Sequence, residues 1–408
     1  MDAIVEVSCG LDVHQATVVA CLLVGRPGRR IERTTRTFGT KTAELEELRE
    51  WLLASGCTCV GMESTGIYWV PVYTVLEGSF QLIVGNAAHI KNVPGRKTDV
   101  KDAEWIADLV RHGLIRPSFV PPKWQRRLRD LVRYRRKLVE AQAAERNRLM
   151  RLLETCNIKL ASVASDVFGV SGRHMLRALI EGKSTPEEMA QLARGALRKK
   201  TDLLTLALHG RLEEHHRFLL HVQLARVEGI EADIAVLDER IEAELAPHKE
   251  ARDRLMQIPG VDRVVAATMV AELGTDMTVF PTDAHAAAWA GVAPGNRESA
   301  GKRQPQGKRR GNVHLCSALV QAAMAASKKK NSYLKERFWK LRARCGPKPA
   351  AVAVAHSILI AAYHMLARKT DYKDLGGDYL DRVAGQRAAR RLIKRVESLG
   401  YKVTPASA

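Results

Sequence analysis

Four acidic residues in the first quarter of the chain have the type and spacing of metal ligands. Asp12 and Glu63 each directly follow an apolar run. Asp99 and Asp102 open a helical pattern and, three residues apart, share one helix face. Acids gathered at the ends of elements repel one another unless a positive group lies between them. In a 408-residue chain of net charge +20, the natural candidates are a divalent metal and a phosphate backbone.

The chemistry that such acids support is phosphodiester cleavage. Carboxylate oxygens that leave room for a phosphate are the ligands that Mg²⁺ takes, and two such ions can activate the attacking oxygen and stabilise the leaving one. The alternative is that Asp99 is a helix cap and Asp102 a first-turn charge. Glu104 and Asp108 on the same helix are further acids that could replace an assigned ligand. The pattern predicts a magnesium site built from the four acids.

The elements that must position these acids alternate between strand and helix from residue 3 to about 117. The pattern predicts strands over residues 4–11, 16–24, 31–38, 57–62 and 80–84, and helices over 41–54, 68–77 and 97–112. Three strands followed by helix and strand repeats favour a mixed α/β sheet of the ribonuclease-H kind. On neighbouring strands of such a sheet, Asp12 and Glu63 would point to the same place.

The length of the chain predicts two or three domains. A Pro-Pro pair at 121–122 marks the first boundary, and strand signals are almost absent from 123 to about 245. The predicted domains are 1–120, a basic helical and coiled-coil region 121–250, a mainly helical domain 251–380 and a basic helical tail 381–408.

The start of the second region is strongly basic. Residues 121–151 hold eleven Lys or Arg and three Asp or Glu. Such a helix contacts phosphates more readily than it packs in a core, although a solvated face is the alternative. The predicted nucleic-acid contacts here are Arg126, Arg127, Arg129, Arg133, Arg135, Arg136 and Lys137.

Apolar residues spaced by two to four positions over 219–245 predict a long amphipathic or coiled-coil helix. A dimer contact and a helical hairpin that packs only on itself explain the spacing equally well.

Two features of the third region point to phosphate. Residues 255–267 form a helix, a Pro-Gly turn and a second helix, the pattern of a helix-hairpin-helix, in which Gly260 would let backbone N–H groups contact a phosphate. An ordinary connection between helices is the alternative. The glycine-rich loop 293–312 holds six basic residues and one acid, and its predicted contacts are Lys302, Arg303, Lys308, Arg309 and Arg310.

Ser299 lies in the middle of this loop. It is a candidate nucleophile or phosphate ligand, but a serine in a loop commonly does no more than form hydrogen bonds, and no activating base is beside it in sequence. His314 is the nearest histidine. Further on, Tyr333, Phe338 and Trp339 are interleaved with cations, and they would either stack on exposed bases or pack in the core.

The remaining composition indicates a cytoplasmic protein. The start of the chain, Met1-Asp2-Ala3, is acidic and leads directly into a predicted strand, so no signal peptide is expected. The long apolar stretch 350–367 contains two histidines and suits a buried helix better than a membrane span. The seven cysteines have neither zinc nor disulfide spacing.

Taken together, four motifs resemble one family. They are Gly10-Leu11-Asp12-Val13-His14, Gly61-Met62-Glu63-Ser64-Thr65-Gly66, Lys97-Thr98-Asp99-Val100-Lys101-Asp102-Ala103 and Glu298-Ser299-Ala300-Gly301-Lys302. Their order and spacing are similar to those of the DEDD transposases of bacterial insertion sequences, the group often called IS-one-ten, over almost the whole chain.

The resemblance implies a RuvC-like domain of ribonuclease-H fold, a coiled-coil segment and a C-terminal transposase domain. It implies that Asp12, Glu63, Asp99 and Asp102 hold Mg²⁺ and that Ser299 is the nucleophile, forming a covalent phosphoserine link before strand exchange and Holliday-junction resolution. The implied partners are target and donor DNA, a structured bridge RNA and further copies of the chain. These copies would form a homodimer and a tetramer of two dimers, in which Ser299 of one chain faces the acids of another. The implied location is the bacterial cytoplasm, at the nucleoid.

Two other functions fit the residues. One is a RuvC-like metal-dependent nuclease or Holliday-junction resolvase that uses water in place of serine. The other is a non-catalytic nucleic-acid-binding derivative.

Overall fold

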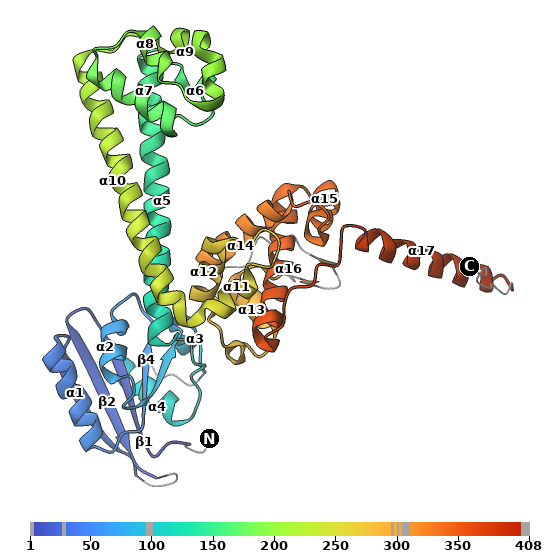
Figure 1. Cartoon of the computed structure of the whole chain (residues 1–408). Coiled ribbons are helices and arrows are strands. Elements are labelled where there is room, and N and C mark those ends of the chain that lie inside the picture. The colour runs from blue at the N-terminus through green and yellow to red at the C-terminus, as the bar shows by residue number, and fades with distance from the viewer. Residues whose placement is uncertain are drawn as a thin grey trace. The chain divides into compact units, whose positions relative to one another are not determined.

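The structure is a computed structural model, and it describes residues 4–26, 30–94, 101–294, 298–299, 302–303 and 311–400 (Figure 1). The chain divides into two compact units, Met1–Pro121 and Pro122–Ala408.

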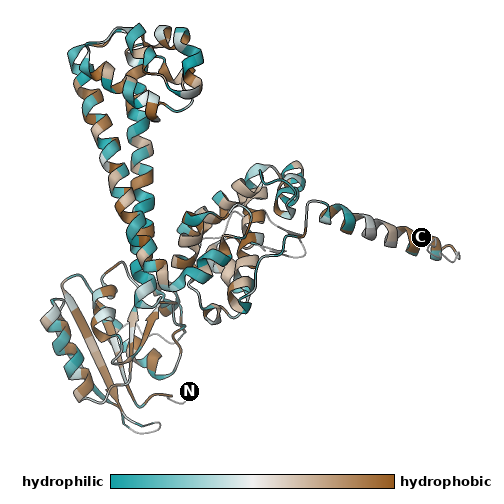
Figure 2. Cartoon of the chain, in the orientation of Figure 1, coloured by the Kyte–Doolittle hydropathy of each residue, from teal (hydrophilic) through white to brown (hydrophobic). Residues whose placement is uncertain are grey.

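The N-terminal unit is built on a five-stranded mixed sheet of order β3-β2-β1-β4-β5. β1 pairs antiparallel with β2 and β2 with β3, whereas β1–β4 and β4–β5 are parallel pairs. The central strands are apolar along both faces, as a sheet covered on both sides requires (Figure 2). The strands are β1 (Val7–Val13), β2 (Thr17–Val24), β3 (Glu32–Gly39), β4 (Cys59–Glu63) and β5 (Gln81–Gly85).

Helices cover both faces of this sheet. α1 (Thr42–Ala54) and α2 (Trp69–Leu76) pack on one face, in a cluster that includes Leu11 and Met62. The buried residues of these helices are Leu45, Leu48, Leu52, Val72 and Leu76. α4 (Asp102–Arg111) packs on the other face, together with the short helix α3 (Ala87–Lys91). Successive residues of β1 and β4 therefore point alternately toward α1 and α2 on one face of the sheet and toward α4 on the other.

The second unit begins with a long antiparallel pair of helices, α5 (Lys123–Thr155) and α10 (Glu214–Leu245). Arg135 bonds to Asp238 at 2.5 Å, and Arg146, further along α5, bonds to Glu231 at 2.8 Å, so the two helices run in opposite directions. Both helices alternate between hydrophobic and hydrophilic residues (Figure 2).

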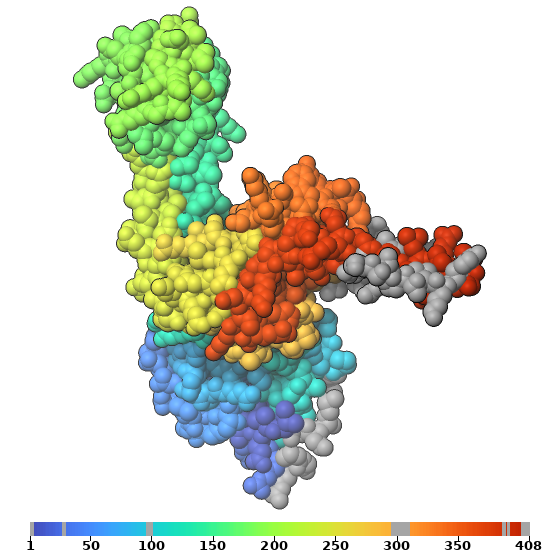
Figure 3. All heavy atoms as spheres, turned by 45° about the vertical axis from the view of Figure 1, so that its right-hand side comes forward, coloured from blue at the N-terminus to red at the C-terminus, as the bar shows by residue number. Residues whose placement is uncertain are grey.

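A small cluster of helices closes the far end of this pair (Figure 3, green). It is held together by buried apolar residues from both long helices and from the short ones. Its elements are α6 (Leu160–Val163), α7 (Val170–Glu181), α8 (Pro186–Gln191), η1 (Gly195–Lys200) and α9 (Thr201–Leu208).

The other end of the pair joins the second core of this unit, in which Leu128, Val132, Ile241 and Leu245 are buried. α16 is the central helix of that core and packs against α13, α14 and α15. The chain from residue 246 onward has the elements η2 (Ala246–His248), α11 (Lys249–Leu255), α12 (Arg263–Leu273), η3 (Met277–Val279), α13 (Asp283–Ala290), the β6–β7 hairpin (Glu298–Ser299 and Lys302–Arg303), α14 (Val313–Ala326), α15 (Tyr333–Cys345), α16 (Pro347–Arg368) and α17 (Tyr379–Glu397). No residue of β6, β7 or α17 belongs to the described core.

The predicted fold class is confirmed: a ribonuclease-H-like mixed sheet precedes a mainly helical region. The apolar stretch 350–367 forms most of α16, which is long and apolar enough to span a membrane but has half of its apolar window buried within the protein. Phe338 is buried, Trp339 is 46% exposed, and the Tyr333 ring packs edge-on against Tyr379. The spacing over 219–245 is explained by pairing of α10 with α5, and a dimer contact stays a prediction.

Candidate active site

Asp12 and Glu63 lie side by side at the carboxyl edge of the sheet. In the parallel pair of β1 and β4, Leu11 is the register partner of Met62, so the next residue of each strand is an acid. Leu11 and Met62 both point into the cluster under α1 and α2. Because strand residues alternate between faces, both acids belong to the face covered by α4.

The first turn of α4 reaches the same edge. Gly10 and Gly61 are register partners two residues before the acids, and a Cβ at Gly10 would collide with the backbone of Ala103 and Ala107. The hydroxyl of Ser8, earlier in β1, donates to the carbonyl of Ala107. α4 therefore runs antiparallel to β1, and its first residue, Asp102, lies toward the end of β1 that carries Asp12.

Arg111 anchors the opposite end of α4. Its side chain is buried and donates to the carbonyl of Glu6 at 3.1 Å and to that of Gly25 at 2.7 Å. These bonds tie the last turn of the helix to the start of β1 and the end of β2, and so fix where its first turn lies.

The acids at this edge keep access to solvent. Asp12 is 28% exposed and its Oδ2 lies 3.1 Å from Nε2 of His14, while Glu63 accepts a hydrogen bond from the hydroxyl of Thr65. Asp102 is exposed. Asp99, the fourth predicted acid, lies outside the described residues. A partly exposed set of carboxylate oxygens of this kind suits Mg²⁺, which retains water when bound.

The two alternative acids of α4 are engaged elsewhere. Glu104 pairs with Arg33 of β3 at 2.6 Å. Asp108 lies nearly two turns from Asp102, and its carboxylate is 3.5 Å from the ring of His112. Neither contact involves the carboxyl edge, so the geometry favours Asp102 over both.

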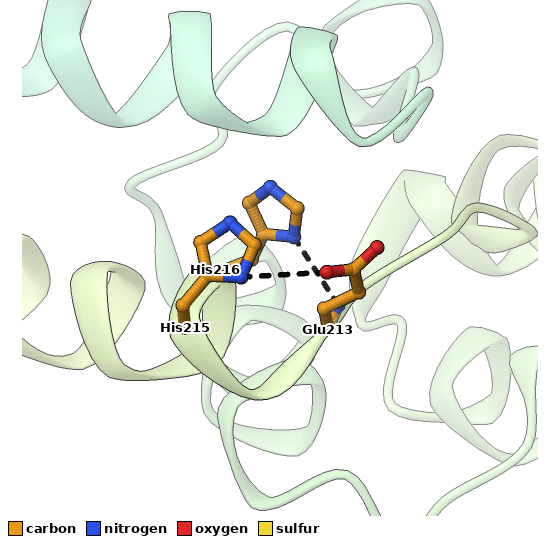
Figure 4. A group of neighbouring side chains, drawn as sticks. All are labelled: Glu213, His215 and His216. Carbon is orange, nitrogen blue, oxygen red and sulfur yellow. Dashed lines mark hydrogen bonds and ion pairs between the residues drawn. The ribbon is translucent and has the colours of Figure 1, made fainter.

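Another group of possible metal ligands lies at the start of α10 (Figure 4). Among the residues that the structure describes, Glu213, His215 and His216 are the group of three or more whose ligand atoms all lie within 4.8 Å of one another. The backbone N–H of Glu213 donates to Nδ1 of His216, so that ring caps the helix. Because Nδ1 of His216 already accepts this bond, the ring is explained as part of the helix cap.

Ser299 belongs to a minimal hairpin in the second unit. Its backbone pairs with Lys302 across the β6–β7 turn. The side chains of Ser299, Lys302 and Arg303, and all of Lys308–Arg310, lie outside the described residues. Their predicted roles stay predictions.

His314 lies in the first turn of α14. It lines a cavity of about 580 Å³ between α5, α10, α12 and α14, and its buried Nδ1 has no hydrogen-bond partner among the described residues. Burial, and secondarily the charge of Arg133, lowers the pKa of His314, so the ring is neutral at pH 7.

The basic residues at the start of α5 divide into those that bind other parts of the protein and those that lie at its surface. Arg129 is 12% exposed and donates to the carbonyls of Ala271 and Glu272, so it caps the C-terminus of α12. Arg133 binds the Glu272 carboxylate and Arg135 that of Asp238.

The expectation that this helix stays out of a core is therefore wrong for its first turns, where Leu128 and Val132 are buried. Arg136 and Lys137 pair with Glu140 on the surface of α5, and Arg127 is exposed. Arg126 is half-buried. Contacts of these residues with nucleic acid stay predictions.

The Pro-Gly turn also has a structural explanation. Gly260 has φ +87°, and a Cβ there would collide with the backbone of Ala322 and Ala326 in α14. Asp262 caps α12 by accepting from the N–H of Val265. Because a carboxylate already occupies this helix N-terminus, the geometry does not favour a phosphate there.

The fold and the acidic edge together define the class of ribonuclease-H-like enzymes that act on phosphodiesters. Residues 9–158 match a transposase family of the DEDD type, DEDD_Tnp_IS110, and residues 252–339 match the family described as Transposase IS116/IS110/IS902. The chain belongs to the IS110 family of transposases, which catalyse DNA transposition. The DEDD domain implies a divalent metal, and the activity implies DNA binding. A comparison with curated proteins found no match.

The sequence prediction missed three kinds of residue. Gly10 and Gly61, where α4 contacts the sheet, each stand two residues before an acid, and this repeated Gly-x-acid pattern was a usable signal. Glu272 is a single acid in an otherwise apolar helical run, which signals a buried ion pair. Arg111 had no signal of this kind.

Proposed function

We propose that this protein is an RNA-guided transposase that cleaves DNA with Ser299, assisted by Mg²⁺ held at Asp12, Glu63, Asp99 and Asp102. The proposal rests on the register of β1 and β4, which makes Asp12 and Glu63 neighbours at the edge that the first turn of α4 reaches. The match to a DEDD transposase family over residues 9–158 supports it.

In the proposed reaction, the Oγ of Ser299 attacks the scissile phosphorus. A bond between Oγ and phosphorus forms, and the bond from phosphorus to one deoxyribose oxygen breaks. The serine proton passes to a carboxylate or to water, and the leaving oxygen takes a proton from solvent. When bound, Mg²⁺ supplies positive charge that favours loss of the serine proton and neutralises the phosphate.

The phosphoserine link conserves the energy of the cleaved bond, so that a second DNA end can replace the serine and complete strand exchange. We propose that a structured bridge RNA selects target and donor DNA. We propose also that Ser299 of one chain meets the acids of another within a dimer or tetramer, at the bacterial nucleoid. The excess of 65 basic over 45 acidic residues supports a complex with two nucleic acids.

Covalent capture tests the serine mechanism. Purified protein with Mg²⁺, end-labelled DNA and the RNA encoded beside the gene is expected to give labelled protein that protease releases as free DNA. Ser299→Ala should abolish the labelled band. Ser162→Ala, which removes an exposed hydroxyl in α6, should leave it unchanged. Cleavage without a covalent band, at equal rates in both variants, would indicate a nuclease that uses water.

A second set of variants tests the metal ligands. Asp12→Asn, Glu63→Gln and Asp102→Asn should each abolish Mg²⁺-dependent cleavage, because each removes a charged oxygen donor from the carboxyl edge. Asp108→Asn and Glu104→Gln are the matched controls on α4, and both should retain cleavage. If Asp108→Asn is inactive and Asp102→Asn is active, the assignment is wrong.

A further inference from the structure

Glu272 is a buried carboxylate at the end of α12, and its side chain is 0% exposed. Arg133 donates to both of its oxygens, at 2.8 and 2.9 Å, and Nε of Arg129 lies 3.3 Å from Oε2. Asn312 Nδ2 donates to Oε2 at 2.7 Å. The carboxylate thus connects α5, α12 and Asn312, the residue that ends the glycine-rich loop 293–312.

Asn312 has two further bonds that fix it in place. Its backbone N–H donates to the carbonyl of Trp289 at 2.9 Å, across the start of the loop. Its Oδ1 accepts from the N–H of Leu315 at 3.0 Å, which makes Asn312 the N-cap of α14.

The two ends of the loop also meet directly. A Cβ on Gly311 would collide with the backbone of Gly291, which has φ +71°. Residues 291 and 311 therefore lie in contact, and the chain between them starts and ends at one place, next to Glu272.

The carboxylate remains ionised in this position. Burial acts to raise the pKa of Glu272, but hydrogen bonds from Arg133 and Asn312 and the charges of both arginines outweigh it and lower the pKa. Bonds from donors to an ionised carboxylate are shorter, stronger and more directional than those between neutral groups.

We propose that Glu272 and Asn312 are positioning residues for the Ser299 nucleophile, through the closed base of the loop that carries it. This inference rests on the proposed role of Ser299. A core needs no ion pair for its stability, since well-packed apolar residues serve as well. The carboxylate at 272 pairs with both arginines and in addition binds the loop through Asn312, a bond that an apolar residue cannot form.

Asn312→Ser isolates this bond. Serine is as good an N-cap as asparagine, so α14 keeps its cap while the donor to Glu272 is lost. Asn312→Asp also keeps the cap and adds a carboxylate that repels Glu272. Asp276→Ser is the matched control, because Asp276 caps η3 in the same unit through the N–H of Thr278.

The measurements are the rate of covalent complex formation at saturating DNA, the DNA affinity and the midpoint of thermal unfolding. Asn312→Ser should slow the covalent step by about 10- to 100-fold, the effect expected of a displacement of about 1 Å, with affinity and midpoint matching those of Asp276→Ser. Asn312→Asp should slow it further.

A rate for Asn312→Ser equal to that of Asp276→Ser, with Ser299→Ala inactive, would overturn this inference and leave the serine mechanism intact. A normal covalent band in Ser299→Ala would instead overturn the proposed function. If Asn312→Ser slows the covalent step and also unfolds at a lower temperature than Asp276→Ser, the role of Asn312 is structural only. That result would also overturn the inference.

Discussion

Replacing Gly10 by alanine is expected to inactivate the DEDD site without touching an acid. A Cβ at Gly10 would lie 2.2 Å from the carbonyl oxygen of Ala103, and an ordinary contact begins at 3.4 Å. The first turn of α4 must therefore move by 3.4 − 2.2 = 1.2 Å, and Asp102, the residue before Ala103, moves with it. A displacement of about 1 Å at a reacting centre costs roughly 100-fold in rate, and overpacking costs about 1–3 kcal/mol of stability.

The assay is Mg²⁺-dependent DNA cleavage, with thermal unfolding measured on the same preparation. Gly61→Ala provides the internal comparison, because its Cβ would meet a side-chain atom, Cγ2 of Val110, and not backbone. Val110→Ala should therefore restore activity to Gly61→Ala and should not restore it to Gly10→Ala. If a folded Gly10→Ala variant cleaves DNA at the wild-type rate, the packing of α4 on β1 does not fix the position of Asp102, and the reasoning is refuted.

Three further outcomes are expected. Glu272→Gln should lower the free energy of unfolding by about 3 kcal/mol in chemical denaturation, because Arg129 and the partly hydrated Arg133 lose their counter-charge. The pKa of Glu272 in the folded protein lies below its usual 4.5. The ionised carboxylate therefore stabilises the wild-type protein fully above about pH 4.5, and this stabilisation is lost as the pH falls through the lowered pKa. The Glu272→Gln variant should not show this loss. Arg127→Ala should reduce the slope of log affinity against log salt by about 1 at unchanged stability, whereas Arg129→Ala should destabilise the protein, and equal effects would contradict the division of α5. Gly229→Ala, in α10 with nothing within 4 Å of the added Cβ, should stabilise by about 0.5–1 kcal/mol, and a loss of stability would contradict the exposed helical position.

The central strands β1, β2 and β4 could be predicted from the sequence because each buries an apolar run, whereas β3 is polar and largely exposed. The order of the strands has another origin. β1 pairs with β4 through residues about fifty positions apart, and nothing local in either strand specifies that pairing. The prediction that Asp12 and Glu63 point to the same place assumed that their strands are neighbours in one sheet. The register of β1 and β4 shows that they are.

The basic helix shows why charge density alone did not predict the role of each arginine. An arginine that caps a helix and one that contacts phosphate use the same donors, so Arg129 and Arg127 look alike in sequence. Their difference arises from α12, whose last carbonyls lie beside Arg129 but belong to a segment more than 140 residues away. Sequence could predict that the region is basic, and only the packing distinguishes its structural from its exposed charges.

The Gly-x-acid pattern of both central strands has one physical explanation. A glycine two residues before each acid lets the backbone of α4 lie close to the sheet, and the alternation of strand residues then turns each acid toward the same face. The helix that the glycines admit presents its N-terminus toward this edge, where its partial positive charge offsets the repulsion among Asp12, Glu63 and Asp102. The docking of α4 therefore contributes both Asp102, the proposed ligand, and a favourable potential for the acids. A single methyl group at Gly10 is accordingly expected to disturb the position and the charge balance of the acids together.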